Sequence, residues 1–556
     1  MVRSRWTHAL IAASGAALLA GCGAKAPAAA PARSAPVSFA LQAGLPVTWY
    51  LPVVPGSEAT LANAQASAQL FQPLIWIGQG YTVDRADSLA QSVSWNAAGT
   101  EYRITLKPWR WSDGRPVTAR DVLFTWSVLQ AASSAAAKAP PAPWPDSGDG
   151  TGGVPQNVAS VTADGPRTVV IRLKQAVNPE WFLYNGIAQF VPMPAAELDR
   201  YPHDPTRELR YLAQVGKNPP AVVDGAFRLT EAVPDQRWVM VPNPKFPGPK
   251  PGLSQLTLLY EASDTAAAVA LKTGAATWGV LPPAYATAAK GVQAPTAPLG
   301  FRGVWLNWRA PGIGKAFADP VVRQALQEAI DEPAIVRTVY HGAAAPDYGP
   351  VPAIPSPLVN PALRHPVYPY DPAQAAAALT RDGWTLQGSV RVKAGQPLRF
   401  TLLYPASSHA DQQVAEILQQ AWARIGVQVT LTPEPLSTII GTMSREPSGW
   451  AAVAELGLTY GGNWPTGESL FLPGAPFDFG GVDIPQLDAA VRATLAPGAT
   501  VSTLQAYEMT AAQTLPVLWL PQPGGVVVHD PRLHGVSRAW VGLTGLWLGD
   551  RLSLTP

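Results

Sequence analysis

The sequence predicts an α/β protein of two or three domains. Its 556 residues far exceed one ordinary hydrophobic core. From about Leu45 onward, strand and helix patterns mix without the strict alternation that builds a parallel sheet. In the second half, amphipathic helices are followed by strands, which indicates a separate α/β lobe.

Local patterns place individual strands and turns. Residues 101–106 (EYRITL) alternate polar and apolar side chains, which predicts a half-buried strand, and Gly114 suits the turn that follows it. Thr118 and Asp121 have the spacing of a capping box, so a helix should begin just after Thr118. Residues 131–157 are rich in Ala, Pro and Gly, and we expect an exposed, mobile loop there. Further strands are predicted at 168–173, 237–241 and 254–260.

Helices in the second half show clear start and stop signals. Three should begin at an aspartate N-cap closely followed by proline, namely Asp319, Asp331 and Asp371. The aspartate can accept the free amide hydrogens of the first turn, and proline suits the first helical positions. Another amphipathic helix, over 414–425, should end at Gly426 before the strand VQVTL.

Composition and charge exclude several classes of protein. Hydrophobic residues make up 47% and charged residues 14% of the chain, whereas roughly 25% are charged in typical globular domains. The apolar residues are too evenly spread for a multispanning membrane protein. The formal net charge is +2 and falls to zero without Arg3 and Arg5. Because no basic field remains, nucleic acid is not an expected partner.

The N-terminal residues have the pattern of a secretory signal. A basic start (MVRSRWTH) precedes a 12-residue apolar run, which is too short to span a bilayer. The letters LAGC at 19–22 resemble the bacterial lipobox, in which the cysteine is acylated. We therefore expect a signal peptide at 1–21, and a lipidated Cys22 with an Ala/Pro tether at 22–36. The alternative is an ordinary secretory signal with an incidental cysteine, although Cys22 is the only cysteine in the chain.

The sequence lacks the motifs of common hydrolases and metal sites. It contains neither G-x-S-x-G nor H-E-x-x-H, and lipidation would consume the sole thiol. The seven histidines are scattered, so we expect no nickel, no other metal and no cofactor. Carboxylate pairs for glycoside hydrolysis stay possible, because any two acids can meet in a fold.

Several longer segments occur in an order that is characteristic of one protein family. They are WSDGRPVTARDVLFTW, DGAFRLTEAVPDQRWVMVPNPKF, DPVVRQALQEAIDEPAIVRTVYHGAA, YDPAQAAAALTRDGW and AEILQQAWARIGVQVTL. Together they resemble bacterial solute-binding proteins of the peptide/nickel type, called family 5 or cluster C. The resemblance covers roughly residues 45–556, nearly the whole mature chain.

The resemblance implies an α/β, two-lobed, periplasmic-binding-protein-like (type II) fold, with an extra subdomain in the first lobe and a hinge between the lobes. Lobe I would comprise residues 37–62, 196–300 and 522–556, and the extra subdomain residues 63–195. Lobe II would comprise residues 301–521. In the family the WSDG segment is a structural element of the subdomain, so its tryptophans should pack around the turn.

The resemblance also indicates two segments near the ligand cleft. QLFQPLIW (69–76) would line the cleft from lobe I, with Leu74 contributing backbone. GVWLNW (303–308) would be the crossover strand into lobe II, with Trp305 and Asn307 as candidate contacts. Trp305 could equally be a buried strand residue.

The ligand-reading segment of lobe II would be residues 455–471 (ELGLTYGGNWPTGESLF). Within it, Tyr460, Asn463 and Trp464 are candidate contacts, because they offer aromatic platforms and one amide for hydrogen bonding. The alternative is a glycine-rich loop whose aromatic residues fill the core of the lobe.

One position in this segment departs from the family pattern. Relatives that take oligopeptides carry an aspartate that pairs with the peptide's α-ammonium, and Gly461 stands at that place here. An unpaired buried ammonium would be costly. Glu455 or Glu468 could compensate, although neither falls on the motif position, and a neutral ligand such as a modified peptide or an oligosaccharide is the alternative.

These features predict a binding protein and not an enzyme. As the resemblance implies, the chain would be the extracytoplasmic substrate-binding lipoprotein of an ABC importer, anchored to the outer face of the cell membrane or periplasmic, and monomeric. It would capture oligopeptide-like solutes by hinge closure and deliver them to a permease with ATPase subunits. Alternatives are the same fold binding an oligosaccharide or other neutral solute, a sensor or chaperone, and an extracellular hydrolase.

The anchor prediction can be tested by Cys22→Ala. The variant should lose its acyl chains and leave the membrane fraction, because no other segment is expected to hold it there. Immunoblots of washed membranes and supernatant measure the distribution. Unchanged retention of the variant would contradict the lipid anchor.

Overall fold

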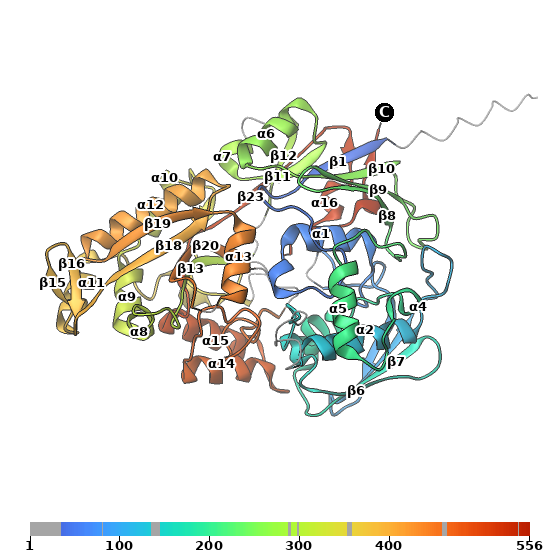
Figure 1. Ribbon diagram of the computed structural model, residues 1–556, viewed down its shortest axis with the longest axis horizontal. Helices are drawn as coiled ribbons and strands as arrows, with labels where there is room; N and C mark the ends of the chain where they lie inside the picture. The colour runs from blue at the N-terminus through green and yellow to red at the C-terminus, as the bar shows by residue number, and fades with distance from the viewer. Residues whose placement is uncertain are drawn as a thin grey trace, which may run out of the picture.

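Two lobes lie side by side in the structure, with lobe I and its subdomain on the right of Figure 1 and lobe II on the left. The computed structural model describes residues 35–79, 82–134, 145–286, 291–296, 300–352, 358–446, 448–458, 464–542 and 544–555. The predicted signal peptide and Cys22 lie outside these residues.

Lobe I is built on a seven-stranded mixed sheet in the order β12-β23-β11-β1-β10-β9-β8. β1 pairs in parallel with β10 and β11, and the other neighbours are antiparallel. The sheet therefore joins stretches of chain that are hundreds of residues apart. Its strands are β1 (Pro36–Ala40), β8 (Phe227–Val233), β9 (Arg237–Pro242), β10 (Gln255–Leu259), β11 (Trp278–Leu281), β12 (Val292–Thr296) and β23 (Gly525–His529), with helices α1 (Leu61–Leu70), α6 (Asp264–Thr273) and α7 (Pro283–Ala286) beside them.

The subdomain is a four-stranded antiparallel sheet in the order β4-β5-β7-β6, with α2 and α5 alongside. The predicted capping box is confirmed, since Thr118 and Asp121 cap α2 reciprocally. Trp109, Trp111 and Trp126 are buried in one core, as the packing role of the WSDG segment required. The elements are β4 (Ala90–Trp95), β5 (Glu101–Leu106), β6 (Val158–Ala163), β7 (Thr168–Leu173) and α2 (Ala119–Ala132). α4 (Ala195–Leu198) and α5 (Pro205–Val215), which lie at and beyond the predicted boundary with lobe I, pack against α2.

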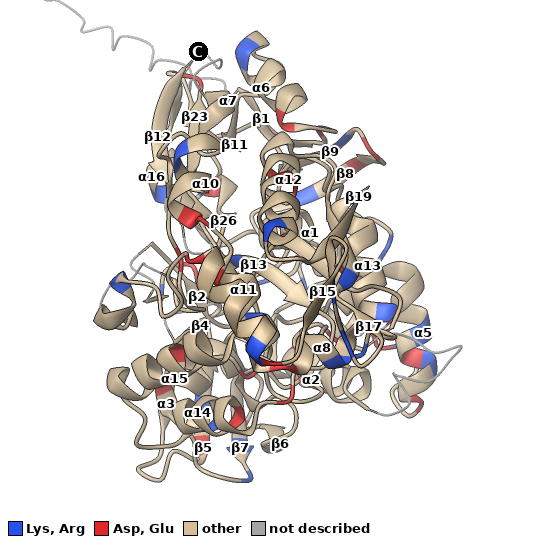
Figure 2. Cartoon of the chain, turned by 90° about the vertical axis from the view of Figure 1, so that its left-hand side faces the viewer, with Lys and Arg blue, Asp and Glu red and all other residues tan. Residues whose placement is uncertain are grey.

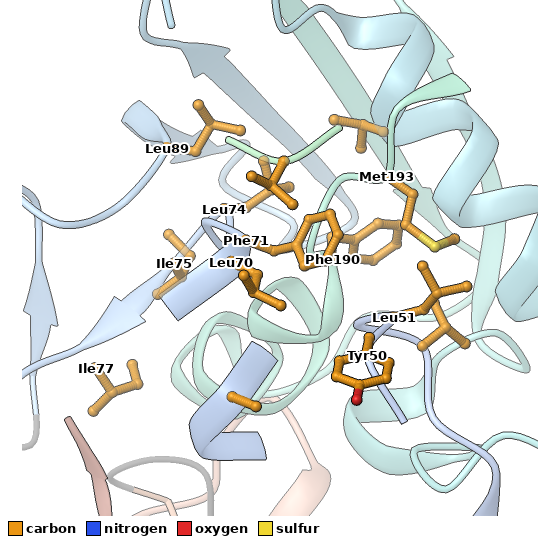
Figure 3. Close-up of a cluster of buried hydrophobic side chains, with 14 of the residues drawn as sticks. Tyr50, Leu51, Leu70, Phe71, Leu74, Ile75, Ile77, Leu89, Phe190 and Met193 are labelled. Atoms are coloured by element: carbon orange, nitrogen blue, oxygen red, sulfur yellow. The ribbon is translucent and has the colours of Figure 1, made fainter. Parts of the chain in front are cut away.

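One continuous hydrophobic core joins the subdomain to the sheet of lobe I. Figure 3 shows part of it, where Leu70, Phe71 and Leu74 meet Phe190 and Met193. Because the two parts share this core, they should move as one body.

The expectation of an exposed loop at 131–157 was wrong for the residues that the structure describes. α2 continues to Ala132, and Asp146, Asp149 and Val154 are all buried. Glycine makes the packing possible, because a Cβ on Gly152 would lie 2.1 Å from the backbone nitrogen of Gly186. Residues 135–144 lie outside the described ranges.

Lobe II holds a five-stranded mixed sheet in the order β19-β18-β20-β13-β21. The predicted N-caps are confirmed: Asp319, Asp331 and Asp371 each accept a backbone amide at the start of a helix. The strands are β13 (Phe301–Leu306), β18 (Arg399–Pro405), β19 (Gln428–Glu434), β20 (Ala452–Leu458) and β21 (Leu518–Leu520). The helices are α8 (Gly314–Ala318), α9 (Pro320–Glu328), α10 (Glu332–Thr338), α11 (Pro372–Arg381), α12 (His409–Arg424), α13 (Leu436–Arg445), α14 (Pro485–Leu495) and α15 (Val501–Thr514).

The chain crosses between the lobes at two places that lie next to each other. It enters lobe II from β12 into β13 and returns from β21 through β22 (Gln522–Pro523) to β23. β13 and β21 are antiparallel neighbours, with Arg302 opposite Leu520. Paired crossings of this kind allow one lobe to rotate on the other about a narrow waist.

Charged residues are sparse over the ribbon in Figure 2, in agreement with their 14% share of the chain. None of the helices in the described ranges is long and apolar enough to span a bilayer.

Several of the carboxyl groups are buried. Burial raises the pKa of Glu508 to about 8 and that of Asp146 to about 7, and it lifts the pKa of Glu332 well above its usual range. The native state therefore keeps these protons at pH values where the unfolded chain, with carboxyl pKa values near 4, has lost them.

We expect the stability of the protein to fall as pH rises from about 4 to about 8, because the native state binds more protons than the unfolded state in this window. The loss should be on the order of 2 kcal/mol or more, measured by chemical unfolding at fixed pH values. Glu508→Gln should flatten part of the decline, whereas Asp483→Asn, at an exposed position of the same lobe, should not. Stability that rises through this window would contradict the prediction.

Candidate functional site: the cavity between the lobes

A cavity of about 770 Å³ lies between the two lobes. Lobe I lines it with α1, the segment after α1 and the first residues of α6, and the subdomain adds residues 147–151 and 184–191. Lobe II lines it with residues 405–411, 455–458 and 466–479. Its size and its position between two lobes are typical of sites that take a small ligand.

The segment 69–76 contributes Phe71, Pro73, Ile75 and Trp76 to the cavity wall. Leu74 itself faces the core: its side chain is buried, its amide donates to the carbonyl of Phe190 at 2.9 Å, and its carbonyl accepts from the amide of Ala90 at 3.0 Å. These hydrogen bonds tie the segment to the subdomain on both sides. They hold the apolar wall in place.

Trp305 and Asn307 lie in the core of lobe II and not among the residues that line the cavity. The indole nitrogen of Trp305 donates to the carbonyl of Leu456 at 3.1 Å, and the Asn307 amide donates to the carbonyl of Trp450 at 2.8 Å. The Trp305 side chain therefore connects β13 to β20, and the Asn307 side chain connects the residue after β13 to the chain just before β20. The position of Trp305 on β13 supports the alternative of a buried strand residue.

Of the candidates in 455–471, Tyr460, Gly461 and Asn463 lie outside the described residues. Trp464 is 4% exposed and does not line the cavity. Its indole nitrogen donates to the carbonyl of Thr494 at 3.1 Å, yet its ring belongs to the core that fills lobe I. Trp464 thus connects the two lobes.

Further hydrogen bonds close the lobes beside Trp464. One oxygen of Glu468 accepts from the Trp181 indole at 2.9 Å and from the Gly152 amide at 3.4 Å. The Asn185 side chain donates to the carbonyl of Trp464 at 3.3 Å. Burial raises the pKa of Glu468. On another side of the cavity, α13 of lobe II packs against the 3₁₀ turn Gly56–Glu58 of lobe I. The structure is therefore a closed form.

An ion-pair cluster that the sequence did not indicate lies at the cavity wall. Nη1 of Arg302 lies 2.7 Å from Oε2 of Glu455 and 3.1 Å from Oδ1 of Asp411. The Tyr340 hydroxyl donates to the same Glu455 oxygen at 3.0 Å. From lobe I, Asp264 lies near enough for Asp411 to raise its pKa and for Arg302 to lower it.

The backbone of β20 explains how Glu455 reaches this cluster. The pairing of β13 with β20 shifts register between Gly303 and Trp305, and Glu455 has a φ of 61°. Such a β-bulge re-aims one side chain at a local cost in strain. Burial then raises the pKa of Glu455 to about 7 and that of Asp264 to about 6, whereas the nearby Arg302 charge lowers both.

Of these residues, only Glu455 had been considered from the sequence. Arg302 and Asp411 carried no local signal, because Arg302 is 109 residues from Asp411 and 153 from Glu455 along the chain. No group of three or more metal-ligating side chains occurs within the described part of the chain.

The comparisons with known proteins agree with this architecture. Residues 86–464 match the model of the bacterial extracellular solute-binding proteins, family 5. This match covers more than half of the chain. The chain belongs to this family. Its members bind solutes, and the two-lobed α/β fold expected from the sequence is confirmed.

Two curated relatives and one solved structure illustrate the likeness. Protein XP55 of Streptomyces lividans is 28% identical over 350 residues, which are 62% of this chain and 58% of that protein. The oligopeptide-binding protein OppA of Mycobacterium tuberculosis is 29% identical over 476 residues, 78% of this chain and 70% of that protein. The structure of AppA from Bacillus subtilis with a nonapeptide has a TM-score of 0.77 at 19% identity and covers 94% of this chain and 100% of that chain.

The contact role of Trp464 can be tested without a ligand. Trp464→Ala should favour the open form, because it removes a large ring from the interface between the lobes, at a cost on the order of 3 kcal/mol. Small-angle X-ray scattering should show a larger radius of gyration, with unchanged circular dichroism.

Trp95→Ala is the matched control, since Trp95 is 45% exposed on the subdomain. It should scatter as the unaltered chain does. Identical scattering from both variants would mean that Trp464 does not help to hold the lobes together.

Proposed function

We propose that this protein is the substrate-binding lipoprotein of an ABC importer, which captures oligopeptide-like solutes by closing its lobes and delivers them to a membrane permease. The observation that carries the proposal is the cavity of about 770 Å³ lined by both lobes. The named relatives that bind oligopeptides, among them OppA and AppA, support the class of ligand.

The mechanism follows from the geometry of the two lobes. Lobe I with its subdomain moves as one body and lobe II as another, because each has its own core. A ligand held first by the apolar segment 71–77 would be covered when lobe II rotates about the adjacent crossings. Only contacts made with both lobes favour closure, since equal affinity for the open and closed forms shifts no population.

The surface that both lobes form together in the closed state would be what the permease recognises. The contacts of Glu468 and Trp464 with the subdomain exist only when the lobes meet. The closed surface is therefore chemically different from the open one. A permease that binds both lobes at once would recognise the loaded state, as reciprocal coupling between ligand and partner requires.

The proposal is tested by native mass spectrometry of the chain, purified without denaturant, with collisional release of bound ligand. We expect added mass that dissociates as a mixture of short peptides, because a cavity that reads the peptide backbone would retain peptides from the host.

Release of a sugar or another non-peptide solute would overturn the peptide assignment and keep the binding fold. An empty protein would be screened by thermal shift against peptide and oligosaccharide panels, where ligand-bound protein unfolds at higher temperature. Stabilisation by sugars alone would again contradict the proposal.

A further inference from the structure

Most of the charged groups in the cavity wall are covered by the protein itself. The side chain of Asp411 is 9% exposed and that of Glu455 is fully covered, and both pair with Arg302. Glu468 is buried as well and accepts hydrogen bonds at the lobe interface. Of the charged side chains that line the cavity within the described ranges, only Arg302 and Asp264 are partly exposed.

Large apolar side chains are partly exposed on both walls of the same cavity. Five of them are here called the apolar surface (Val54, Val191, Leu436, Ile440 and Phe477). The two valines pack against the core that lobe I shares with its subdomain. The other three pack against the core of lobe II. Each wall therefore presents an extension of its own hydrophobic core to the cavity.

Leu436 shows what the two walls do where they meet. It is the first residue of α13, and it packs against the buried cluster of lobe I as well as that of lobe II. α13 also contacts the 3₁₀ turn Gly56–Glu58, which follows Val54 closely in the chain. At this point apolar contact joins the two cores directly.

The remainder of the apolar surface borders the cavity of about 770 Å³ between the lobes. Apolar side chains that line a cleft favour an apolar occupant, because water leaves both surfaces when they meet. An occupant that contacts both walls would continue the junction that Leu436 begins.

We propose that the cavity selects peptides with large apolar side chains, which fill the space between the two walls and join the two cores. This inference rests on the proposed function, since it names the side chains that the same cavity prefers. An apolar side chain that contacts both walls loses its water fully only when the lobes close, so it favours the closed form. A polar side chain of similar size would leave hydrogen-bonding groups without partners against the apolar surface.

The test uses two pools of random peptides, three to six residues long and with identical free ends, titrated against the protein purified without denaturant. In the apolar pool, alternate positions hold Leu, Ile, Val or Phe and the others hold Gly. In the polar pool, the same positions hold Ser, Thr, Asn or Gln. Native mass spectrometry at pH 7 measures the bound fraction of each pool. Because both pools carry the same charges, a difference between them reports the side chains alone.

We expect the apolar pool to bind at least about tenfold more tightly than the polar pool, since full burial of one leucine-sized side chain changes affinity by roughly tenfold to a hundredfold. Equal binding of the two pools, or tighter binding of the polar pool, would overturn this inference and leave the proposed function standing. Binding of neither pool would overturn both.

Two variants connect the preference to the apolar surface. Val54→Thr on lobe I changes the volume of the side chain little but adds a hydroxyl group, and it should lower the preference at least about threefold without weakening the polar pool. Ile440→Thr, on the opposite lobe, should act in the same direction and serves if the first variant folds poorly.

Leu386→Thr is the matched control, because Leu386 on β15 (Thr385–Gln387) is 59% exposed and does not line the cavity. It should leave the preference unchanged, and circular dichroism should show that all three variants are folded. A preference that survives both Val54→Thr and Ile440→Thr would also overturn the inference.

Discussion

The ion pairs of Arg302 are the constraint on which the binding cavity depends. Arg302 lies on the strand that enters lobe II, opposite the strand that leaves it, and its guanidinium holds Asp411 at the start of α12 and Glu455 on β20. One side chain therefore connects the crossing to the helix and the strand that face lobe I. Arginine suits this place, because it stays charged and its planar head can serve several oxygens at once.

This cluster is expensive to keep in a closed cavity. Burying charges costs several kcal/mol per ion unless pairing and hydrogen bonds offset it, and a buried acceptor without a donor costs about 1–3 kcal/mol more. The positive φ of Glu455 adds local strain. Such violations of local rules tend to occur where a protein binds something, since a ligand can complete what the fold leaves unsatisfied.

Because the chain carries few charges, the carboxyl groups of the cleft dominate its local electrostatic potential. With 14% charged residues and a single base in the described cavity wall, few neighbouring charges compete with the acids of the cleft. Inside a low-dielectric cavity each remaining charge acts over a longer range than on a surface. The aromatic residues have a structural role. Trp111 packs in the core of lobe I and its subdomain, and Trp464 packs at the contact between the lobes.

The sequence by itself determined the local elements and the family, whereas only the tertiary structure decided the site. The Thr118–Asp121 capping box and the aspartate caps of α9, α10 and α11 were predictable, because the atoms involved lie within three residues of each other. Trp305 and Asn307 were predicted near the ligand from motif position, but both side chains are buried in lobe II. For Trp305 on β13, strand membership alone does not reveal which face a cavity will occupy.

Arg302 and Glu455 are 153 residues apart, and Trp181 and Glu468 are 287 apart. Contacts over such separations leave no periodicity in the chain, so the Arg302 cluster forms only when lobe II folds and the cavity only when the two lobes meet.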